Sequence, residues 1–130
     1  MGARHHRHRA VAEALALGGG EPLADVDYPF AEGERRRQRS LRIDLLARVA
    51  QLRLDDREPR AALAAAEELI ALDALNELGW RLAMEAEAAL GARQAVVERY
   101  RLLSAELDRS LGLRPHAETR ASYRRLLAQR

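Results

Sequence analysis

Residues 45–107 read LLARVAQLRLDDREPRAALAAAEELIALDALNELGWRLAMEAEAALGARQAVVERYRLLSAEL. Within this stretch the pattern of residue types repeats once, with a period of 34 residues. The paired positions are Leu46/Trp80, Val49/Ala83, Ala50/Met84, Ala62/Val96, Ala66/Tyr100 and Leu69/Leu103. A large apolar residue opens each unit, and small or apolar residues follow at helical spacing. A unit of this length cannot bury its apolar faces alone, so we expect the two units to stack on each other.

A period of 34 is that of the tetratricopeptide repeat, a helix–turn–helix unit of two antiparallel helices. The spacing matches better than the identities do. The usual glycine of the first helix is Ala50 or Met84 here, and the usual closing proline is Ala74. We predict an all-α fold, a tetratricopeptide-like array of antiparallel helix pairs with about six helices. The alternative is a generic antiparallel helix bundle in which this register is accidental.

Apolar spacing together with Gly and Pro predicts where the helices lie. Pro59 suits the first turn of a helix, where its missing N–H would have no partner, and Gly112 is placed as a left-handed cap. Trp80 is predicted to be a core residue rather than a stacking platform for a ligand. Period-two alternation is absent, so no strand is predicted. The expected helices are residues 9–17, 31–54, 59–72, 77–90, 92–110 and 116–129, after a connection over 18–30.

The predicted helix over residues 31–54 carries two apolar stripes. One consists of Leu41, Leu45, Val49 and Leu52, and the other of Ile43, Leu46, Ala50 and Leu54. A helix with two such stripes is expected to be packed on two sides, as in a stacked array.

The composition indicates one packed domain of 130 residues, with 48% hydrophobic and 32% charged residues. The net charge of +2 does not by itself indicate a nucleic-acid surface. Without cysteine there is no disulfide framework, and no apolar run reaches the ~20 residues of a membrane span. We expect a cytoplasmic protein with a basic tail over residues 1–9 and a single domain over residues 10–130.

Catalytic chemistry is not indicated. There is no cysteine, and His116 is the one histidine outside the N-terminal tail. No serine has a histidine at a sequence spacing that suggests a catalytic pair, and the acidic residues are spread along helix faces. We therefore predict no enzyme activity, no catalytic residue, no cofactor and no metal site. Three histidines, His5, His6 and His8, lie in the N-terminal tail and could bind a divalent metal adventitiously. We favour the interpretation that this segment is a frayed basic tail.

Arginines on two predicted helices are candidates for nucleic-acid contact. Arg35, Arg39 and Arg42 fall on one helix face, and Arg120 and Arg124 lie on the outer side of the last helix. Such a strip suits phosphate contact. The alternative, which we favour, is a solvated helix face whose charge is partly offset by Glu32 and Glu34.

The C-terminal segment is more specific than the periodicity. Residues 111–123 read LGLRPHAETRASY and are followed by RRLL. This segment resembles the end of the bacterial transcriptional activator domain, the tetratricopeptide-like module of SARP-type actinobacterial regulators. The resemblance covers residues 10–130 and includes ALAL at 14–17, GEPLAD at 20–25, and the segments 31–42 and 95–107.

Two positions depart from this family's pattern. Gly18 stands in place of the usual tryptophan, and His116 in place of a capping serine. The second change is expected to weaken the start of the last helix by about 1 kcal/mol. In full-length family members a winged-helix DNA-binding domain precedes this module, and we expect the present chain to lack it.

The resemblance implies a non-catalytic protein–protein interaction or dimerisation domain of a transcriptional activator. The partner is expected to be another protein or a second copy (a homodimer), with DNA contacted only indirectly or weakly and no membrane. Partner contact is assigned to the inner helices of the two pairs, through Arg48, Gln51, Arg81 and Glu85. The alternatives are direct nucleic-acid binding through the arginine-rich faces, or a truncated remnant of a SARP-type regulator.

Overall fold

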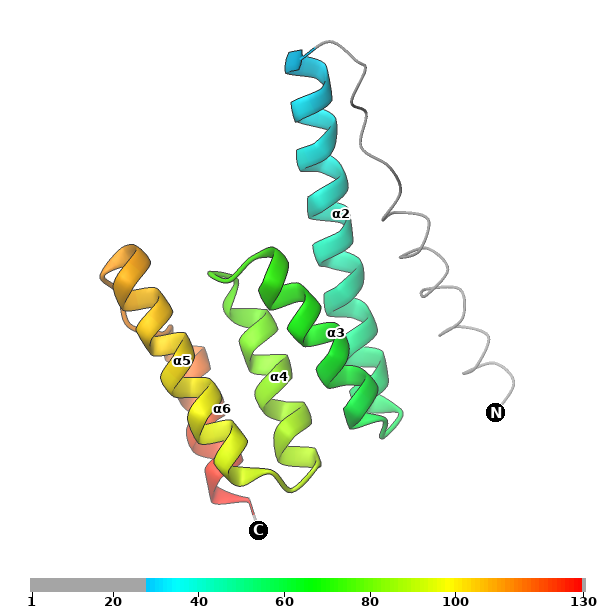
Figure 1. The fold of residues 1–130 in the computed structure, drawn as a ribbon. Helices are drawn as coiled ribbons and strands as arrows, with labels where there is room; N and C mark the ends of the chain where they lie inside the picture. Colours follow the sequence, from blue (N-terminus) through cyan, green and yellow to red (C-terminus); the bar gives the residue numbers. More distant parts are fainter. Residues whose placement is uncertain (1–27, 130) are drawn as a thin grey trace.

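The computed structural model describes the backbone of residues 28–129 and the side chains of residues 31–129, and within this range it contains five helices and no strand (Figure 1). The helices are α2 (Tyr28–Asp55), α3 (Pro59–Leu72), α4 (Glu77–Ala89), α5 (Arg93–Leu111) and α6 (Ala117–Ala128). The all-α prediction is confirmed, and all five helices predicted in this range are present. The predicted helix over residues 9–17 and the predicted tail over residues 1–9 lie outside the described residues.

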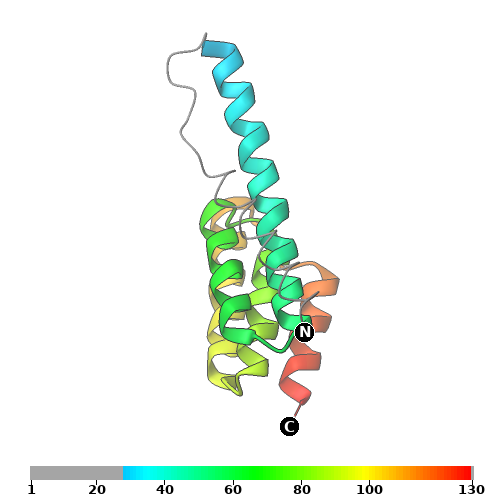
Figure 2. The ribbon, with the colours of Figure 1, turned by 90° about the vertical axis from the view of Figure 1, so that its right-hand side faces the viewer.

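The helices form two antiparallel pairs followed by a single helix. α2 packs on α3, α3 on α4 and α4 on α5, while α2 also contacts α4. α6 lies against both α4 and α5, and it makes no contact with α2. The helix axes share one general direction, and the N-terminal half of α2 extends beyond the other helices (Figures 1 and 2). This is the stacked arrangement expected of tetratricopeptide-like units.

The helix boundaries reproduce the sequence period. α2 ends at Asp55 and α4 at Ala89, while α3 begins at Pro59 and α5 at Arg93. Each pair of boundaries is 34 residues apart, so the turn between the two helices of a unit is repeated without insertion. The register inferred from the sequence is therefore the structural register.

The core is built mainly from the residues that carry the repeat. Small alanines at the contact positions let the helices approach closely, and a Cβ atom added to Gly79 of α4 would lie 2.9 Å from Cδ2 of Leu69 on α3. The fully buried residues of the repeat are Leu46, Ala50, Ala62, Ala66, Leu69, Ala83, Met84 and Leu103. Burial of this apolar surface supplies the main stabilisation of the fold.

Trp80 is buried, as predicted, and packs with Leu103 and Leu107 of α5. Its indole N–H donates a hydrogen bond of 2.8 Å to the carbonyl oxygen of Ala74 in the α3–α4 turn. Trp80 therefore fills the core and also holds the turn at Ala74, the position where a tetratricopeptide repeat usually has a proline.

Two further contacts join the second pair to α6. The rings of Tyr100 on α5 and Tyr123 on α6 are nearly parallel and stack with their centroids 3.9 Å apart. Next to them, Met84, Val96 and Leu126 form a buried cluster. α6 is thus fixed by aromatic and aliphatic packing as well as by polar contacts.

A network of ion pairs crosses three helices. The Arg99 guanidinium on α5 is paired with Glu87 of α4 at 2.8 Å and with Glu67 of α3 at 2.9 Å. Burial opposes the charge on Arg99, but the hydrogen bonds from its guanidinium to Glu87 and Glu67 outweigh burial and raise its pKa. The charged form is therefore retained at this junction, where it fixes the relative position of α3, α4 and α5.

Two further ion pairs lie along α5. Arg101 pairs with Glu98 at 2.6 Å, and Arg109 pairs with Glu106 at 2.7 Å. Hydrogen bonds from these arginines lower the pKa of both carboxyl groups. Such exposed pairs add little to stability.

The prediction that α2 is packed on both sides along its stripes is wrong at Leu41. This side chain is 54% exposed, because no helix of the described residues covers that side of α2. Leu78 of α4 is likewise 39% exposed. None of the helices in the described range is long and apolar enough to cross a membrane.

Candidate partner-binding surface

The inner faces of α2 and α4 enclose a hollow of about 700 Å³, which we call the inner hollow. Its lining comes from α2 for the most part, with two leucines from α4. The lining residues are Leu41, Asp44, Leu45, Ala47, Arg48, Gln51, Leu78 and Leu82. The lining is therefore mainly apolar, with the charged and amide groups of Asp44, Arg48 and Gln51.

Two of the four residues assigned to partner contact lie in the inner hollow. Arg48 and Gln51 are both exposed, one turn apart on α2. Gln51 donates a hydrogen bond of 3.0 Å to Asp55 on the same helix. Within the described residues the Arg48 guanidinium makes no hydrogen bond or ion pair, so it is available to a carboxylate.

The other two assigned residues face α6 instead. Arg81 donates a hydrogen bond of 2.8 Å to the Thr119 hydroxyl, and Glu85 pairs with Arg125 at 3.1 Å. Both side chains are half-buried. The structure therefore brings Arg48 and Gln51 together in one hollow, while Arg81 and Glu85 contribute to holding the last helix.

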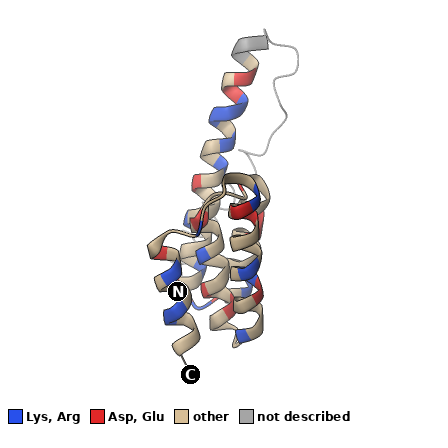
Figure 3. Cartoon of the chain, turned by 90° about the vertical axis from the view of Figure 1, so that its left-hand side faces the viewer, with Lys and Arg blue, Asp and Glu red and all other residues tan. Residues whose placement is uncertain are grey.

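The arginines considered for nucleic-acid contact fall into two groups on helices that do not touch. On α2, Arg35 is exposed, Arg39 donates to the carbonyl oxygen of Leu72, and Arg42 lies 3.7 Å from Glu68. Acidic and basic positions both occur along the projecting part of α2 (Figure 3). On this helix, much of the predicted strip is thus engaged by α3.

The second group, on α6, is also partly engaged. Arg120 donates a hydrogen bond of 2.7 Å to the carbonyl oxygen of Pro115, whereas Arg124 is exposed. The structure does not bring the two arginine groups together into one basic surface. These five arginines therefore do not form one continuous patch of the kind that marks many nucleic-acid surfaces.

The start of α6 is held by a residue that the sequence reasoning missed. His116 is the N-cap residue of α6, and its side chain makes no capping hydrogen bond. The buried carboxylate of Glu77 accepts the backbone N–H of His116 at 3.0 Å. In a capping box a glutamate of the same helix accepts that N–H. Here the glutamate comes from α4, 39 residues upstream.

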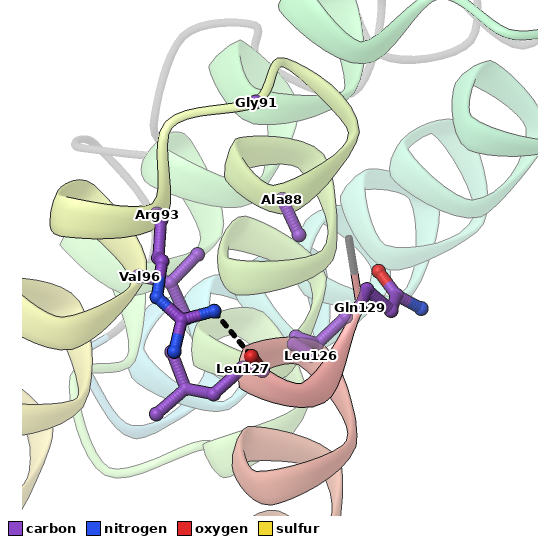
Figure 4. A pocket seen from close by; sticks show the side chains of 7 residues that line it. All are labelled: Ala88, Gly91, Arg93, Val96, Leu126, Leu127 and Gln129. Carbon is purple, nitrogen blue, oxygen red and sulfur yellow. Dashed lines mark hydrogen bonds between the residues drawn. The ribbon is translucent and has the colours of Figure 1, made fainter.

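A further hollow of about 450 Å³ lies at the opposite end of the molecule, between the α4–α5 turn and the end of α6 (Figure 4). Leu126, Leu127, Val96 and Ala88 give it apolar walls. The Arg93 guanidinium donates to the carbonyl oxygen of Leu127, so its charge stabilises the C-terminal end of α6. No nucleophile and base come together among these lining residues, and the hollow offers no catalytic arrangement.

Metal-ligand geometry is likewise missing from the described part of the chain, where no group of three histidine or acidic side chains is placed to hold a metal ion. His116 is the only histidine in that part, and its side chain is 75% exposed.

Comparison with known proteins gives one match. The model of the family described as the bacterial transcriptional activator domain matches residues 1–127 of the chain. No curated protein and no solved structure matches.

Proposed function

The chain belongs to the bacterial transcriptional activator domain family, and on this premise we propose that it serves transcriptional activation as a non-catalytic protein–protein interaction module. The observation that carries the proposal is the inner hollow, a mainly apolar recess between α2 and α4 that also presents Arg48 and Gln51. A role in bacterial transcription also supports a cytoplasmic location.

The inner hollow suits a partner segment that inserts apolar side chains and presents an acidic group. Leu41 and Leu78 are exposed there, and surfaces of this kind gain free energy when a partner covers them. Arg48, which has no partner within the described residues, offers a guanidinium for bidentate contact with a carboxylate. Gln51 adds an adjustable donor and acceptor one turn further along α2.

Arg81 and Glu85 have a supporting part in this proposal. Their contacts with Thr119 and Arg125 fix α6 beside α4, the helix that contributes Leu78 and Leu82 to the inner hollow. Neither Arg81 nor Glu85 lines the inner hollow, so we assign both an indirect part in partner binding.

Site-directed photo-crosslinking in cells tests this assignment. A photoreactive residue at position 51 is expected to capture a component of the transcription machinery or its regulators, whereas the same residue at exposed position 64 on α3 captures none. Combining Arg48→Glu with Arg81→Glu should abolish the crosslink from position 51. The matched control is Arg60→Glu, which reverses an exposed arginine on α3 and should leave the crosslink intact. Equal crosslinking from both positions would contradict the proposal.

A further inference from the structure

A separate hollow, of about 550 Å³, lies between α5 and α6 beside the connection that joins them, and we call it the α5–α6 hollow. It shares no lining residue with the inner hollow. Its volume is within the range of small-molecule sites, which usually present a few polar groups on apolar walls. The polar side chains of its lining are Tyr100, Ser104, Asp108, Arg114 and Arg120.

Three segments bring these side chains to the α5–α6 hollow. The polar residues from α5 follow one another at intervals of four, so they lie along one face of that helix. α5 ends at Gly112 in the left-handed conformation, and the connection after it carries Arg114. Arg120 of α6 is held in place, because its guanidinium donates a hydrogen bond of 2.7 Å to the carbonyl oxygen of Pro115. Much of the lining is therefore in position before a ligand arrives, which reduces the entropic cost of binding.

The charged and hydroxyl groups of this lining lack partners in the described part of the chain. There the side chains of Ser104, Asp108 and Arg114 make no hydrogen bond or ion pair. Arg120 uses one guanidinium nitrogen for Pro115, which leaves its other N–H groups for a ligand. By contrast, two exposed arginines of α5 outside the hollow are each paired with a glutamate of the same helix. Unpaired polar groups thus gather at one hollow, as in a ligand site.

The charges of the lining define the kind of ligand that fits. Two guanidinium groups and one carboxylate face the α5–α6 hollow from its walls. The complementary ligand carries two anionic groups and one cationic group. A guanidinium binds a carboxylate through two parallel hydrogen bonds, and a carboxylate accepts strong hydrogen bonds from an ammonium group. An amino acid with a second carboxylate in its side chain has this set of groups.

We propose that the α5–α6 hollow binds a free acidic amino acid, aspartate or glutamate. The carboxylates of the ligand pair with Arg114 and Arg120, and its ammonium group pairs with Asp108. The Ser104 hydroxyl is a further donor or acceptor. A phosphodiester backbone presents negative charge alone, so Asp108 opposes it. The bound amino acid joins α5, the connection and α6, and so acts as an effector of the last helix.

The expected affinity is modest. Asp108 and Arg114 are both exposed, so their ion pairs with the ligand are partly screened by solvent. We therefore expect a Kd of about 0.1 to 1 mM. Because the residues of the two hollows differ, this proposal does not depend on the partner assigned to the inner hollow.

Titration of the isotopically labelled full chain, followed by two-dimensional NMR, is the first test. L-Glutamate and L-aspartate, each added to about 10 mM at constant ionic strength, should give saturable shifts centred on residues 100–120. Glutarate lacks the ammonium group and L-glutamine lacks the second carboxylate, so each should bind at least about tenfold more weakly than L-glutamate. Shifts that do not saturate would overturn the proposal. So would glutarate or inorganic phosphate binding as tightly as L-glutamate.

Variants of the lining provide the second test. Arg114→Gln removes an exposed charge without a protein partner in the described range and should raise the Kd for L-glutamate by about tenfold or more. Asp108→Asn should weaken L-glutamate binding but strengthen glutarate binding, because the carboxylate that attracts the ammonium group and repels a dicarboxylate is gone. Arg109→Gln changes an exposed arginine of α5 outside the hollow and should leave the Kd unchanged.

Circular dichroism of each variant verifies that the helices are intact. If Arg114→Gln and Arg109→Gln have the same effect on the Kd, the assigned site is wrong, whatever the crosslinking from position 51 shows.

Discussion

At the scale of single residues, the equivalent turns of the two repeat units carry different residues at the position with positive φ. Arg57 and Gly91 lie 34 residues apart and both adopt positive φ, at 60° and 76°. In both turns the next residue donates its N–H to a carbonyl five residues back, Glu58 to Arg53 at 2.8 Å and Ala92 to Glu87 at 2.9 Å. This is the Schellman ending of a helix, in which glycine is the usual residue. The first unit therefore carries an arginine where its backbone favours glycine.

We expect Arg57→Gly to stabilise the protein by about 0.5–1 kcal/mol, since relief of the left-handed strain exceeds the added entropy of the unfolded chain. Arg57 is exposed, so the change removes no buried contact. Gly91→Ala should cost about 1 kcal/mol for the converse reason. Urea denaturation followed at 222 nm measures both. A loss of stability in Arg57→Gly would show that the arginine side chain contributes more than the turn conformation costs.

At the scale of the elements, α6 depends on a carboxylate from another helix. Glu77 is the first residue of α4, and its carboxylate also accepts the N–H at the N-cap of α6. One buried negative charge thus lies at the N-terminal ends of two helices, where the helix dipoles favour it. Because His116 provides no side-chain cap, this contact is the main polar anchor for the start of α6.

Removing that charge should loosen α6 selectively. Glu77→Gln keeps the shape of the side chain and is expected to cost about 1–2 kcal/mol through loss of a charge-assisted hydrogen bond and of the dipole interactions. Hydrogen exchange should accelerate in residues 117–128 more than in α2 and α3. Glu118→Gln, which neutralises an exposed acid in the first turn of α6, is the control and should cost less than about 0.5 kcal/mol. Uniform acceleration along the whole chain would contradict a local role for Glu77.

The elements themselves were predictable because their signals are local. Pro59, Gly91 and Gly112 mark helix ends by their own backbone preferences, and the period of 34 places Trp80 in the core. Contacts between helices were not predictable in the same way. From the sequence, an arginine on a helix face is expected to be solvated. Only the packing of α2 on α3 shows that Arg39 donates a hydrogen bond to the carbonyl oxygen of Leu72. Similarly, the apolar period could not show that no described helix covers Leu41 and Leu78.

At the scale of the whole molecule, stacking decides which side chains are available to a partner. Of the four residues predicted to contact a partner, Arg48 and Gln51 line the inner hollow, while Arg81 and Glu85 turn to α6. One hollow beside the α3–α4 turn is lined by exposed leucines from segments more than 30 residues apart, Leu75 and Leu78 on one side and Leu111 and Leu113 on the other. Their gathering follows from the stacking of α4 and α5 and has no local sequence signature.

The same stacking separates the arginines, which leads to a prediction about DNA. Arg35 and Arg36 are exposed on the projecting half of α2, whereas Arg39 and Arg42 are engaged by α3 and the α6 group lies apart. We therefore expect the chain to neutralise only two or three phosphates at a time, so that log K falls with log salt with a slope of about −2 to −3. Fluorescence anisotropy with a labelled duplex between 50 and 200 mM salt measures this slope.

Two variants connect this slope to the structure. Combining Arg35→Ala with Arg36→Ala should remove most of the binding, because both exposed residues belong to the N-terminal half of α2. That half of the helix extends beyond the other helices (Figure 2). Arg120→Ala should leave binding unchanged, because Arg120 is half-buried and donates to Pro115. A slope of about −6 or steeper would require both arginine groups to meet one duplex at once. Such a result would favour direct nucleic-acid binding over the interaction module, since helices that do not touch would then be acting as one basic surface.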